Sequence, residues 1–264
     1  MAKHRKPPSK QACAKNVDKR DGKNPPLFGI HAVEAALNNP ERDIQRLFAT
    51  PNAARRLQAA IAKSGTPVET VSPRDLDRLI GAQSVHQGVI LEAAPLPIPD
   101  LETITATRSS TSTLLVVLDQ VTDPHNVGAV IRSAAAFGAT GLIMTQRHSP
   151  PLAGALAKAA SGALEHVRIS LQPNLARALQ ELGELGIVRI GLESSAPSPI
   201  EGLDLSGPTA LVLGAEDKGL RRLTRENCDL LCHITTPGPT PSLNVSNAAA
   251  VALHLAAIPH HPGR

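Results

Sequence analysis

Aromatic side chains are almost absent from this sequence of 264 residues, which has three Phe and neither Tyr nor Trp. Hydrophobic residues nevertheless make up 42% of the chain, enough for a buried core. That core must be built from Leu, Ile, Val and Ala. The scarcity of aromatics also argues against proteins that read single-stranded RNA by stacking its bases on aromatic side chains.

Cysteine is also rare, with only Cys13, Cys228 and Cys232 in the chain. Three cysteines do not form a disulfide framework, and this number is typical of proteins from a reducing compartment. The sequence Cys228-x-x-x-Cys232-His233 lacks the second pair of ligands of a structural zinc site. We therefore predict no bound metal.

Long hydrophobic runs are missing as well. No apolar segment approaches the roughly 20 residues that a helix needs to cross a bilayer. The basic residues near the start are not followed by the apolar region and cleavage site of a signal peptide. We expect a cytoplasmic protein without a membrane segment.

Positive charge is concentrated at the start of the chain. Residues 1–24 hold eight Lys or Arg and two Asp, whereas the remaining 240 residues hold 19 Lys or Arg and 21 Asp or Glu, a net charge of −2. A stretch so poor in large apolar side chains is typical of disorder, so we predict a disordered basic tail over residues 1–26. Such a tail is either a solvated segment or an arm that attracts phosphate non-specifically.

Three common catalytic signatures are absent. Where the first strand of the main unit meets a helix, the sequence has D-P-H-N-V-G (123–128) and not the G-x-G-x-x-G of dinucleotide-binding folds. The Walker A lysine motif and the G-x-S-x-G nucleophile elbow are also missing. Dehydrogenase, NTPase and α/β-hydrolase functions therefore lose their main support.

An alternation of strands and helices runs through the rest of the chain. The apolar run Leu114–Leu118 predicts a strand, the turn 119–125 leads into a helix that ends near Phe137, and residues 141–145 predict the next strand. Further strands are expected at 44–50, 67–71, 88–93, 167–170, 187–192, 209–213 and 231–235. Further helices are expected at 29–37, from 52 to the stop at Gly65, from Pro73, and at 152–160, 174–185, 220–226 and 244–258.

This pattern predicts an α/β protein with two units. Near-continuous apolar strands separated by helices indicate a mostly parallel sheet that is covered on both faces. We expect a smaller α/β domain at 27–94, a linker rich in Pro, Ser and Thr at 95–113, in which a short helix is suggested after Asp100, and a larger domain at 114–264.

The first polar cluster follows the strand at 114–118. Turns at the carboxyl ends of strands are where open α/β sheets usually bind ligands. Asn126 is suited to cap the helix there, and Arg132 lies nearly two turns further along a helix of small residues. Arg132 is either a ligand for phosphate or carboxylate groups or an ordinary exposed helix cation.

The second cluster ends the strand at 209–213. Gly214 would let the backbone come close to a ligand, and Glu216 follows two residues later. Gly219 precedes a short basic helix. Glu216 is either a functional carboxylate or an acidic residue of a surface turn.

The third cluster precedes the last helix. Three prolines between residues 237 and 241 make a stiff loop, and Ser242, Asn244 and Ser246 bring polar groups to the helix start. Capping of the helix explains one of these three residues. We expect the other two to contact a ligand.

Together the three clusters resemble a known family. The motifs D-P-x-N-x-G-x-x-x-R, G-x-E-x-x-G and S-L-N-V-S, in this order at the ends of successive strands, are similar to those of the SpoU branch of the SPOUT RNA ribose 2′-O-methyltransferases. The resemblance spans about residues 113–258. It implies a deep trefoil knot, S-adenosylmethionine as the cofactor, and a homodimer whose sites lie near the subunit interface.

The resemblance also implies roles for particular residues. Gly214, Ile234 and Leu243 would hold the cofactor. The residues lining the reacting site would be Asn126, Arg132, Glu216, Ser242 and Asn244. One departure is visible, because the family usually has Ile-Pro-Met where this chain has Ile-Thr-Thr at 234–236.

The amino-terminal unit supports a ribosomal substrate. GIHAVEAAL (29–37) and HQGVILEA (86–93) resemble the substrate-binding domain of bacterial enzymes that methylate a guanosine of 23S ribosomal RNA, which implies an L30e-like RNA-binding domain. The alternatives are a transfer RNA ribose 2′-O-methyltransferase and a non-catalytic ribosomal RNA-binding or assembly factor. The complete polar set disfavours the non-catalytic alternative.

The implied reaction moves a methyl group to a ribose 2′-OH, which must lose its proton as the new bond forms. Family proposals assign the base to the residue at Arg132. A guanidinium has a pKa above about 12, and a nearby phosphate favours its charged form further. We therefore expect Arg132 to hold the phosphate and the developing alkoxide, while the proton leaves through water or another polar group.

Overall fold

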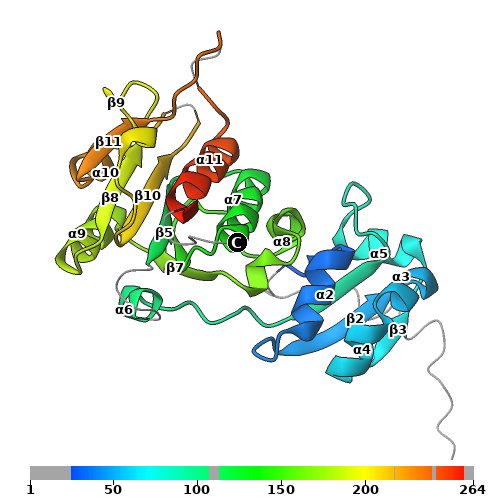
Figure 1. The fold of residues 1–264 in the computed structure, drawn as a ribbon. Helices are drawn as coiled ribbons and strands as arrows, with labels where there is room; N and C mark the ends of the chain where they lie inside the picture. The colour runs from blue at the N-terminus through cyan, green and yellow to red at the C-terminus, as the bar shows by residue number, and fades with distance from the viewer. Residues whose placement is uncertain (1–24, 107–112, 217, 240–241, 259–264) are drawn as a thin grey trace, which may run out of the picture.

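The computed structural model describes residues 25–106, 113–216, 218–239 and 242–258. These residues form two α/β units side by side, one drawn in blue and cyan and the other in green to red (Figure 1). The first unit has a four-stranded sheet and the second a seven-stranded sheet. The predicted tail, residues 1–26, lies almost wholly outside the described residues.

The first unit combines antiparallel and parallel pairing. Its strands lie in the order β1-β4-β2-β3, and β4 is antiparallel to both neighbours, whereas β2 and β3 are parallel. The strands are β1 (Leu27–Phe28), β2 (Ile44–Ala49), β3 (Val68–Thr70) and β4 (Val89–Ala93). The helices are α2 (Ile30–Asn38), α3 (Pro51–Arg56), α4 (Gln58–Ser64) and α5 (Pro73–Ile80).

The second unit is built on a parallel sheet, as predicted. The strand order is β7-β6-β5-β10-β8-β11-β9, and every neighbouring pair of described strands is parallel. The strands are β5 (Leu114–Asp119), β6 (Gly141–Thr145), β7 (Arg168–Gln172), β8 (Val188–Leu192), β9 (Ser198–Pro199), β10 (Thr209–Gly214) and β11 (Leu230–His233). The trefoil knot stays a prediction.

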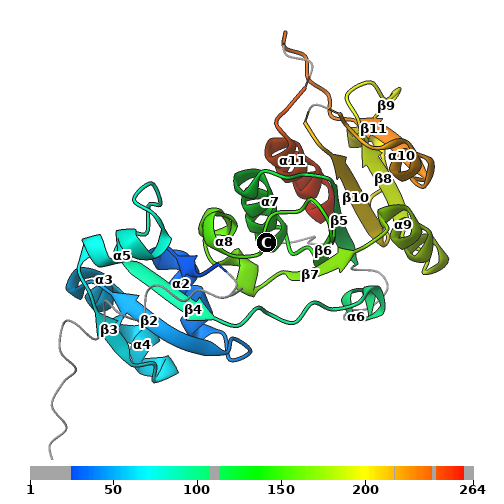
Figure 2. The same ribbon diagram turned by 180° about the vertical axis from the view of Figure 1, so that it is seen from behind.

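Helices cover both faces of this sheet (Figures 1 and 2). The helices are α6 (Leu101–Thr105), α7 (Pro124–Ala136), α8 (Gly154–Ala160), α9 (Leu175–Glu184), α10 (Arg222–Glu226) and α11 (Val245–Ala257). Val116 of β5 packs in the cluster that contains α7, α8 and α11, whereas its neighbours Leu115 and Val117 pack with α6 and α9. Successive strand residues point to opposite faces, so the wholly apolar β5 serves both layers.

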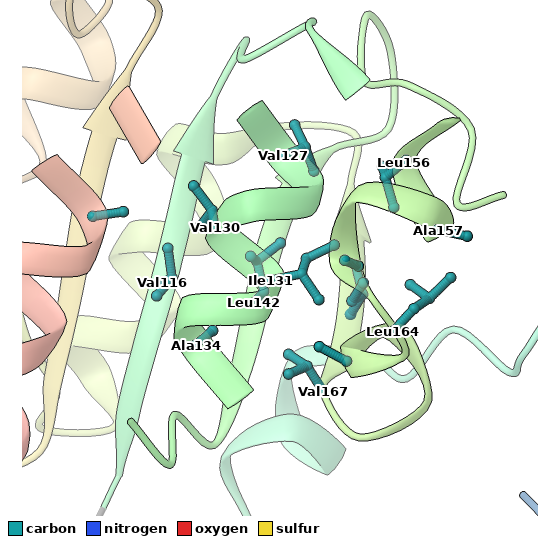
Figure 3. Packing of buried hydrophobic residues seen from close by; sticks show 14 of the residues in the cluster. Val116, Val127, Val130, Ile131, Ala134, Leu142, Leu156, Ala157, Leu164 and Val167 are labelled. Carbon is teal, nitrogen blue, oxygen red and sulfur yellow. The ribbon is translucent and has the colours of Figure 1, made fainter. Parts of the chain in front are cut away.

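Helix α7 lies between the sheet and α8, with its apolar side chains packed against both (Figure 3). Gly128 makes this close approach possible. A Cβ atom at this position would lie 2.6 Å from the backbone oxygen of Leu156 and 2.6 Å from Cβ of Ala159. The glycine of the first motif therefore has a packing role between two helices.

Local signals explain most helix boundaries. Ser72 and Asp75 form the capping box at the start of α5, which begins at Pro73 as predicted. Gly65 ends α4 in the left-handed conformation with a φ of 67°, also as predicted. The helix predicted from near Asn52 begins one residue earlier, at Pro51, because Thr50 accepts the capping hydrogen bond.

Some elements were missed from the sequence. The predicted helix that starts near residue 52 is divided at Leu57 into α3 and α4. Strands β1 and β9 were not predicted because each has two residues, too few to show a periodic pattern. The suggested short helix after Asp100 is present as α6, with Asp100 as its N-cap.

A buried ion pair joins the two units. Arg42, after α2, donates to both carboxylate oxygens of Glu165 at 3.2 Å and 2.5 Å, and the side chains are 4% and 2% exposed. Glu165 ends a 3-10 turn, η2 (Ala163–Glu165), that contacts α2. Asn39 donates to the same carboxylate at 2.7 Å, and Arg42 also donates to the carbonyl of Ala94 at 2.9 Å. The pair therefore has the additional hydrogen bonds that buried charges require.

Replacing Glu165 with alanine should destabilise the protein strongly. The substitution leaves the Arg42 guanidinium buried without its carboxylate, a change that costs about 3–5 kcal/mol in comparable buried pairs. Urea unfolding, followed by circular dichroism, measures the loss. Glu226→Ala is the control, because Glu226 pairs with Arg222 on the exposed surface of α10. Equal stabilities of the two variants would contradict the proposed role of the buried pair.

Candidate active site

The carboxyl ends of four neighbouring strands lie at one edge of the parallel sheet. β10 lies between β5 and β8, and Gly214 at the end of β10 pairs with Asp119 at the end of β5. β11 follows on the other side of β8. The loops that carry the three predicted polar clusters leave from β5, β10 and β11. The parallel pairing therefore brings the three motifs to one edge.

Glu216 lies at the centre of a hydrogen-bonded cluster from all three motifs. Its Oε1 accepts a hydrogen bond from Nδ2 of Asn126 at 2.9 Å and another from Nδ2 of Asn244. The backbone N–H of Val245 donates to the same oxygen at 3.4 Å. Nδ2 of Asn244 also donates to Oδ1 of Asn126 at 3.1 Å. Three of the predicted site residues thus meet, although 118 positions separate Asn126 from Asn244.

Asn126 does not cap its helix, so this prediction was wrong. α7 begins earlier, at Pro124, and the side chain of Asp123 accepts the hydrogen bond from the N–H of His125 at 2.9 Å. Proline favours the first helical position because its fixed φ suits a helix and its missing N–H is not needed there. Asn126 therefore lies inside the first turn, where its amide group reaches Glu216.

Asn244 has two roles at the start of α11. Its Oδ1 accepts hydrogen bonds from the N–H of Ser246 at 2.9 Å and from Oγ of Ser246 at 2.5 Å, which makes Asn244 the N-cap. Its Nδ2 group donates to the other motifs. Ser246 is accounted for by the cap and needs no ligand. Ser242 and Leu243 are exposed just before it, with Leu243 at 40%.

The loop after β10 is tightly folded, which explains its glycines. A Cβ atom on Gly214 would lie 2.1 Å from the backbone of Gly219, because Ala215 and Gly219 form a bridge across the loop. Gly219 has a φ of 60°, in the left-handed region that favours glycine. Gly214 thus permits the approach of its own loop, and a cofactor contact at this position stays a prediction.

Asp119 was not recognised in the sequence, where it looked like the polar end of a strand. Its side chain is fully buried and accepts hydrogen bonds from the backbone N–H of Arg221 at 3.0 Å and from its Nε at 2.6 Å. These bonds tie the far end of the Glu216 loop to β5. An aspartate that ends an otherwise apolar strand was the only available signal.

Arg132 lies apart from the cluster. It is exposed on α7 six residues beyond Asn126, which places it about 9 Å further along the helix axis. Arg132 lines a groove of about 670 Å³ between the two units, opposite His31, Glu34 and Asn38 of α2. It forms no ion pair with another described residue. The guanidinium is therefore available to a ligand that lies across the two units.

The cysteine pair shows no sign of a metal site. Among the residues that the structure describes, no group of three His, Cys, Asp or Glu side chains is arranged to hold a metal ion. The pKa of the Cys228 thiol is raised to about 12, chiefly by burial; Arg189 opposes this increase, and the charges of Asp229 and Asp119 add to it. Burial also raises the pKa of Cys232.

In the part of the chain that the structure describes, no helix has the length and apolar character needed to span a bilayer.

The fold and the cluster define an α/β protein with a polar site at the carboxyl edge of a parallel sheet, next to a smaller α/β unit. Residues 113–254 match the model of the SpoU rRNA Methylase family, and residues 26–99 match the model described as RNA 2′-O ribose methyltransferase substrate binding. The chain belongs to the SpoU rRNA Methylase family and is an RNA 2′-O-methyltransferase.

Named relatives cover most of the chain. It is 40% identical over 233 residues to the 23S rRNA (guanosine-2′-O-)-methyltransferase RlmB of Pseudomonas aeruginosa, and 37% identical over 234 residues to RlmB of Pseudomonas putida. Each alignment covers 86% of this chain and 93% of the relative.

A solved structure has the same fold. The SpoU methyltransferase AviRb from Streptomyces viridochromogenes, in complex with AdoMet, has a TM-score of 0.76 and is 24% identical. The match covers 96% of this chain and 98% of that one. At 24% identity, this match shows that the two chains share a fold.

Replacing Glu216 with alanine should loosen the start of α11. The substitution removes the acceptor shared by Asn126, Asn244 and the N–H of Val245, and one such hydrogen bond contributes about 1 kcal/mol. Hydrogen exchange measured by mass spectrometry should therefore become several-fold faster over residues 242–248. Glu216→Gln keeps an oxygen acceptor and should have a smaller effect, and Glu226→Ala should have none there. Unchanged exchange in Glu216→Ala would count against the cluster.

The two described cysteines should resist alkylation in the folded protein. With a pKa of about 12, roughly one Cys228 side chain in ten thousand is a thiolate at pH 8, and the thiolate is the reactive form. Iodoacetamide at pH 8 should leave Cys228 and Cys232 unmodified in the native protein and modify both in urea. Peptide mass spectrometry gives the result, and rapid labelling of native Cys228 would contradict it.

Proposed function

We propose that this chain transfers a methyl group from S-adenosylmethionine to the ribose 2′-OH of a guanosine in 23S ribosomal RNA. The observation that carries the proposal is the convergence of Asn126, Glu216 and Asn244, one from each motif, at one edge of the sheet. The choice of substrate is supported by the 23S rRNA (guanosine-2′-O-)-methyltransferases, which match over most of this chain. We place the activity in the cytoplasm.

The residues at the sheet edge suit the proposed cofactor. Ile234 is half-buried after β11, and Leu243 exposes 40% of its surface beside polar Ser242 and Asn244. An exposed apolar side chain next to polar groups fits a nucleoside, whose base is flat and apolar on its faces and polar at its edge. We propose that Ile234, Leu243 and the backbone at Gly214 hold the cofactor. When bound, S-adenosylmethionine supplies an electrophilic methyl group on its sulfonium.

The polar cluster and Arg132 would have different roles in the reaction. Glu216 orients the amides of Asn126 and Asn244, which leaves their loops in one arrangement before substrate binds. Ser242 would bond the ribose or the cofactor. Arg132 would hold a substrate phosphate and stabilise the developing alkoxide, since a guanidinium stays charged and offers a fork of donors. The 2′-OH proton would leave through water or another polar group.

The groove at Arg132 gives the amino-terminal unit its proposed role. Residues 27–94 would form the L30e-like RNA-binding domain, residues 95–113 the linker and residues 114–264 the methyltransferase domain. Because α2 forms the wall opposite Arg132, RNA bound to the first unit would enter the same groove. We further propose a homodimer with sites near the subunit interface and a trefoil knot in the second unit.

Incubation of the purified protein with isotope-labelled S-adenosylmethionine and total bacterial RNA, followed by nuclease mapping, tests the function. We expect label on one ribose of 23S ribosomal RNA. Label on transfer RNA would support the transfer RNA alternative. The absence of label from every RNA, including an assembly intermediate of the large subunit, would favour a non-catalytic binding or assembly factor.

Arg132→Ala should lower the single-turnover rate of methyl transfer by about 10²-fold or more, the usual effect of removing one charge-stabilising group from a transition state. Cofactor affinity should change little, because Arg132 faces the groove between the units. Arg177→Ala, on exposed α9, is the matched control. Arg132→Lys keeps the charge but not the fork and should be intermediate. A lysine variant with the wild-type rate and pH profile would exclude both the clamp and an essential arginine base.

A further inference from the structure

Thr235 lies in the loop after β11, directly after the proposed cofactor contact Ile234. No proline stands at this position. Proline restricts a loop by fixing φ near about −65° and cannot donate a backbone hydrogen bond. Thr235 has neither property, so the loop needs another constraint if Ile234 is to keep one position.

Glu201 supplies such a constraint. Its Oε1 accepts a hydrogen bond from the backbone N–H of Thr235 at 2.9 Å, and its Oε2 accepts one from the hydroxyl of Thr235 at 3.2 Å. One carboxylate thus binds both groups that distinguish threonine from proline at this position. A charged acceptor makes each of these bonds stronger than a neutral one.

Glu201 is itself held in place. It lies in a 3-10 turn, η3 (Ile200–Gly202), whose Ile200 is fully buried. The turn follows β9, which pairs in parallel with β11 so that Pro199 lies opposite His233. Glu201 and Thr235 each come two residues after this pair, so they also lie opposite each other. Here the side chain of Glu201, and not a backbone carbonyl, accepts the hydrogen bond from the N–H of Thr235. Nδ1 of His233 also lies 2.8 Å from the carbonyl oxygen of Ala196.

The charge state of Glu201 agrees with this arrangement. Burial alone would raise the pKa of Glu201. The backbone N–H groups of Glu201 and Thr235, the Thr235 hydroxyl and the charge of His233 together hold that pKa below its usual value. The carboxylate is therefore ionised, and can accept both hydrogen bonds, at neutral pH.

We propose that Glu201 is a positioning residue for the cofactor, which clamps Thr235 and so fixes Ile234. The inference rests on the proposed cofactor contact of Ile234. Glu201 does not touch the reacting atoms. Its effect should appear in cofactor affinity and not in the rate at saturating cofactor.

A double-substitution cycle tests the clamp. The proteins are the wild type, Glu201→Ala, Thr235→Pro, and the combination, with S-adenosylmethionine affinity measured by calorimetry in the absence of RNA. Glu201→Ala should raise the Kd by about 5–10-fold in the wild-type background, because a loop without the clamp must be ordered when the cofactor binds. The same substitution should change the Kd by less than about 2-fold in the Thr235→Pro background, because proline has no N–H to bind and fixes the loop by itself.

The single-turnover methyl-transfer rate at saturating cofactor should stay within about 2-fold of the wild type in all four proteins, because ground-state positioning of the cofactor affects binding and not the chemical step. Glu201→Gln should bind between the wild type and Glu201→Ala. The clamp is overturned if Glu201→Ala raises the Kd equally in both backgrounds, if it has no effect, or if a folded Thr235→Pro protein does not bind the cofactor.

Two further measurements keep the outcomes distinct. If Thr235→Pro does not fold, Thr235→Val removes the hydroxyl alone, and its cycle with Glu201→Ala must still show coupling. Hydrogen exchange at Thr235 reports the clamp without any cofactor and should accelerate in Glu201→Ala. A wild-type protein that binds no S-adenosylmethionine would refute the proposed function, whereas normal binding with unchanged exchange in Glu201→Ala would refute the clamp alone.

Discussion

The parallel pairing of β5 with β10 is the constraint on which the site depends. Because both strands run in the same direction and Gly214 lies opposite Asp119, the loops that follow them start side by side. The buried Asp119 carboxylate then binds Arg221 and returns the second loop to the first strand. Antiparallel pairing would have sent the two loops to opposite edges of the sheet. The pairing of β5 with β10 thus brings the two loops together, and only then can the side chains of these loops contact each other.

One carboxylate then connects three loops that are distant in the sequence. Glu216 is an acceptor only, and the groups around it are amide donors, so the charge determines which way Asn126 and Asn244 face. Arg132 lies outside this network, on the groove between the units. The arrangement separates residues that hold the loops from a cation that remains available, which suits an enzyme that binds both a cofactor and a large anionic substrate.

The two units are also connected through charge. Arg42 and Glu165 are almost fully buried, and Asn39 and the carbonyl of Ala94 satisfy their remaining hydrogen-bonding groups. Such a pair is costly to break and sensitive to geometry, so it favours one placement of α2 beside η2. That placement gives the groove at Arg132 its second wall. The position of the amino-terminal unit therefore follows from an interaction between residues outside the three motifs.

The sequence by itself determined the order of the main strands and helices, the parallel sheet and the set of polar residues, because apolar periodicity and turn residues are local signals. It did not determine that Asp123 caps α7 while Asn126 reaches Glu216, nor that Arg132 faces α2 and not the cluster. It also held no reason to pair Arg42 with Glu165, Asp119 with Arg221, or Glu201 with Thr235. These contacts join residues between 34 and 123 positions apart. Only tertiary structure decides them, since strand register and helix packing determine which distant side chains meet.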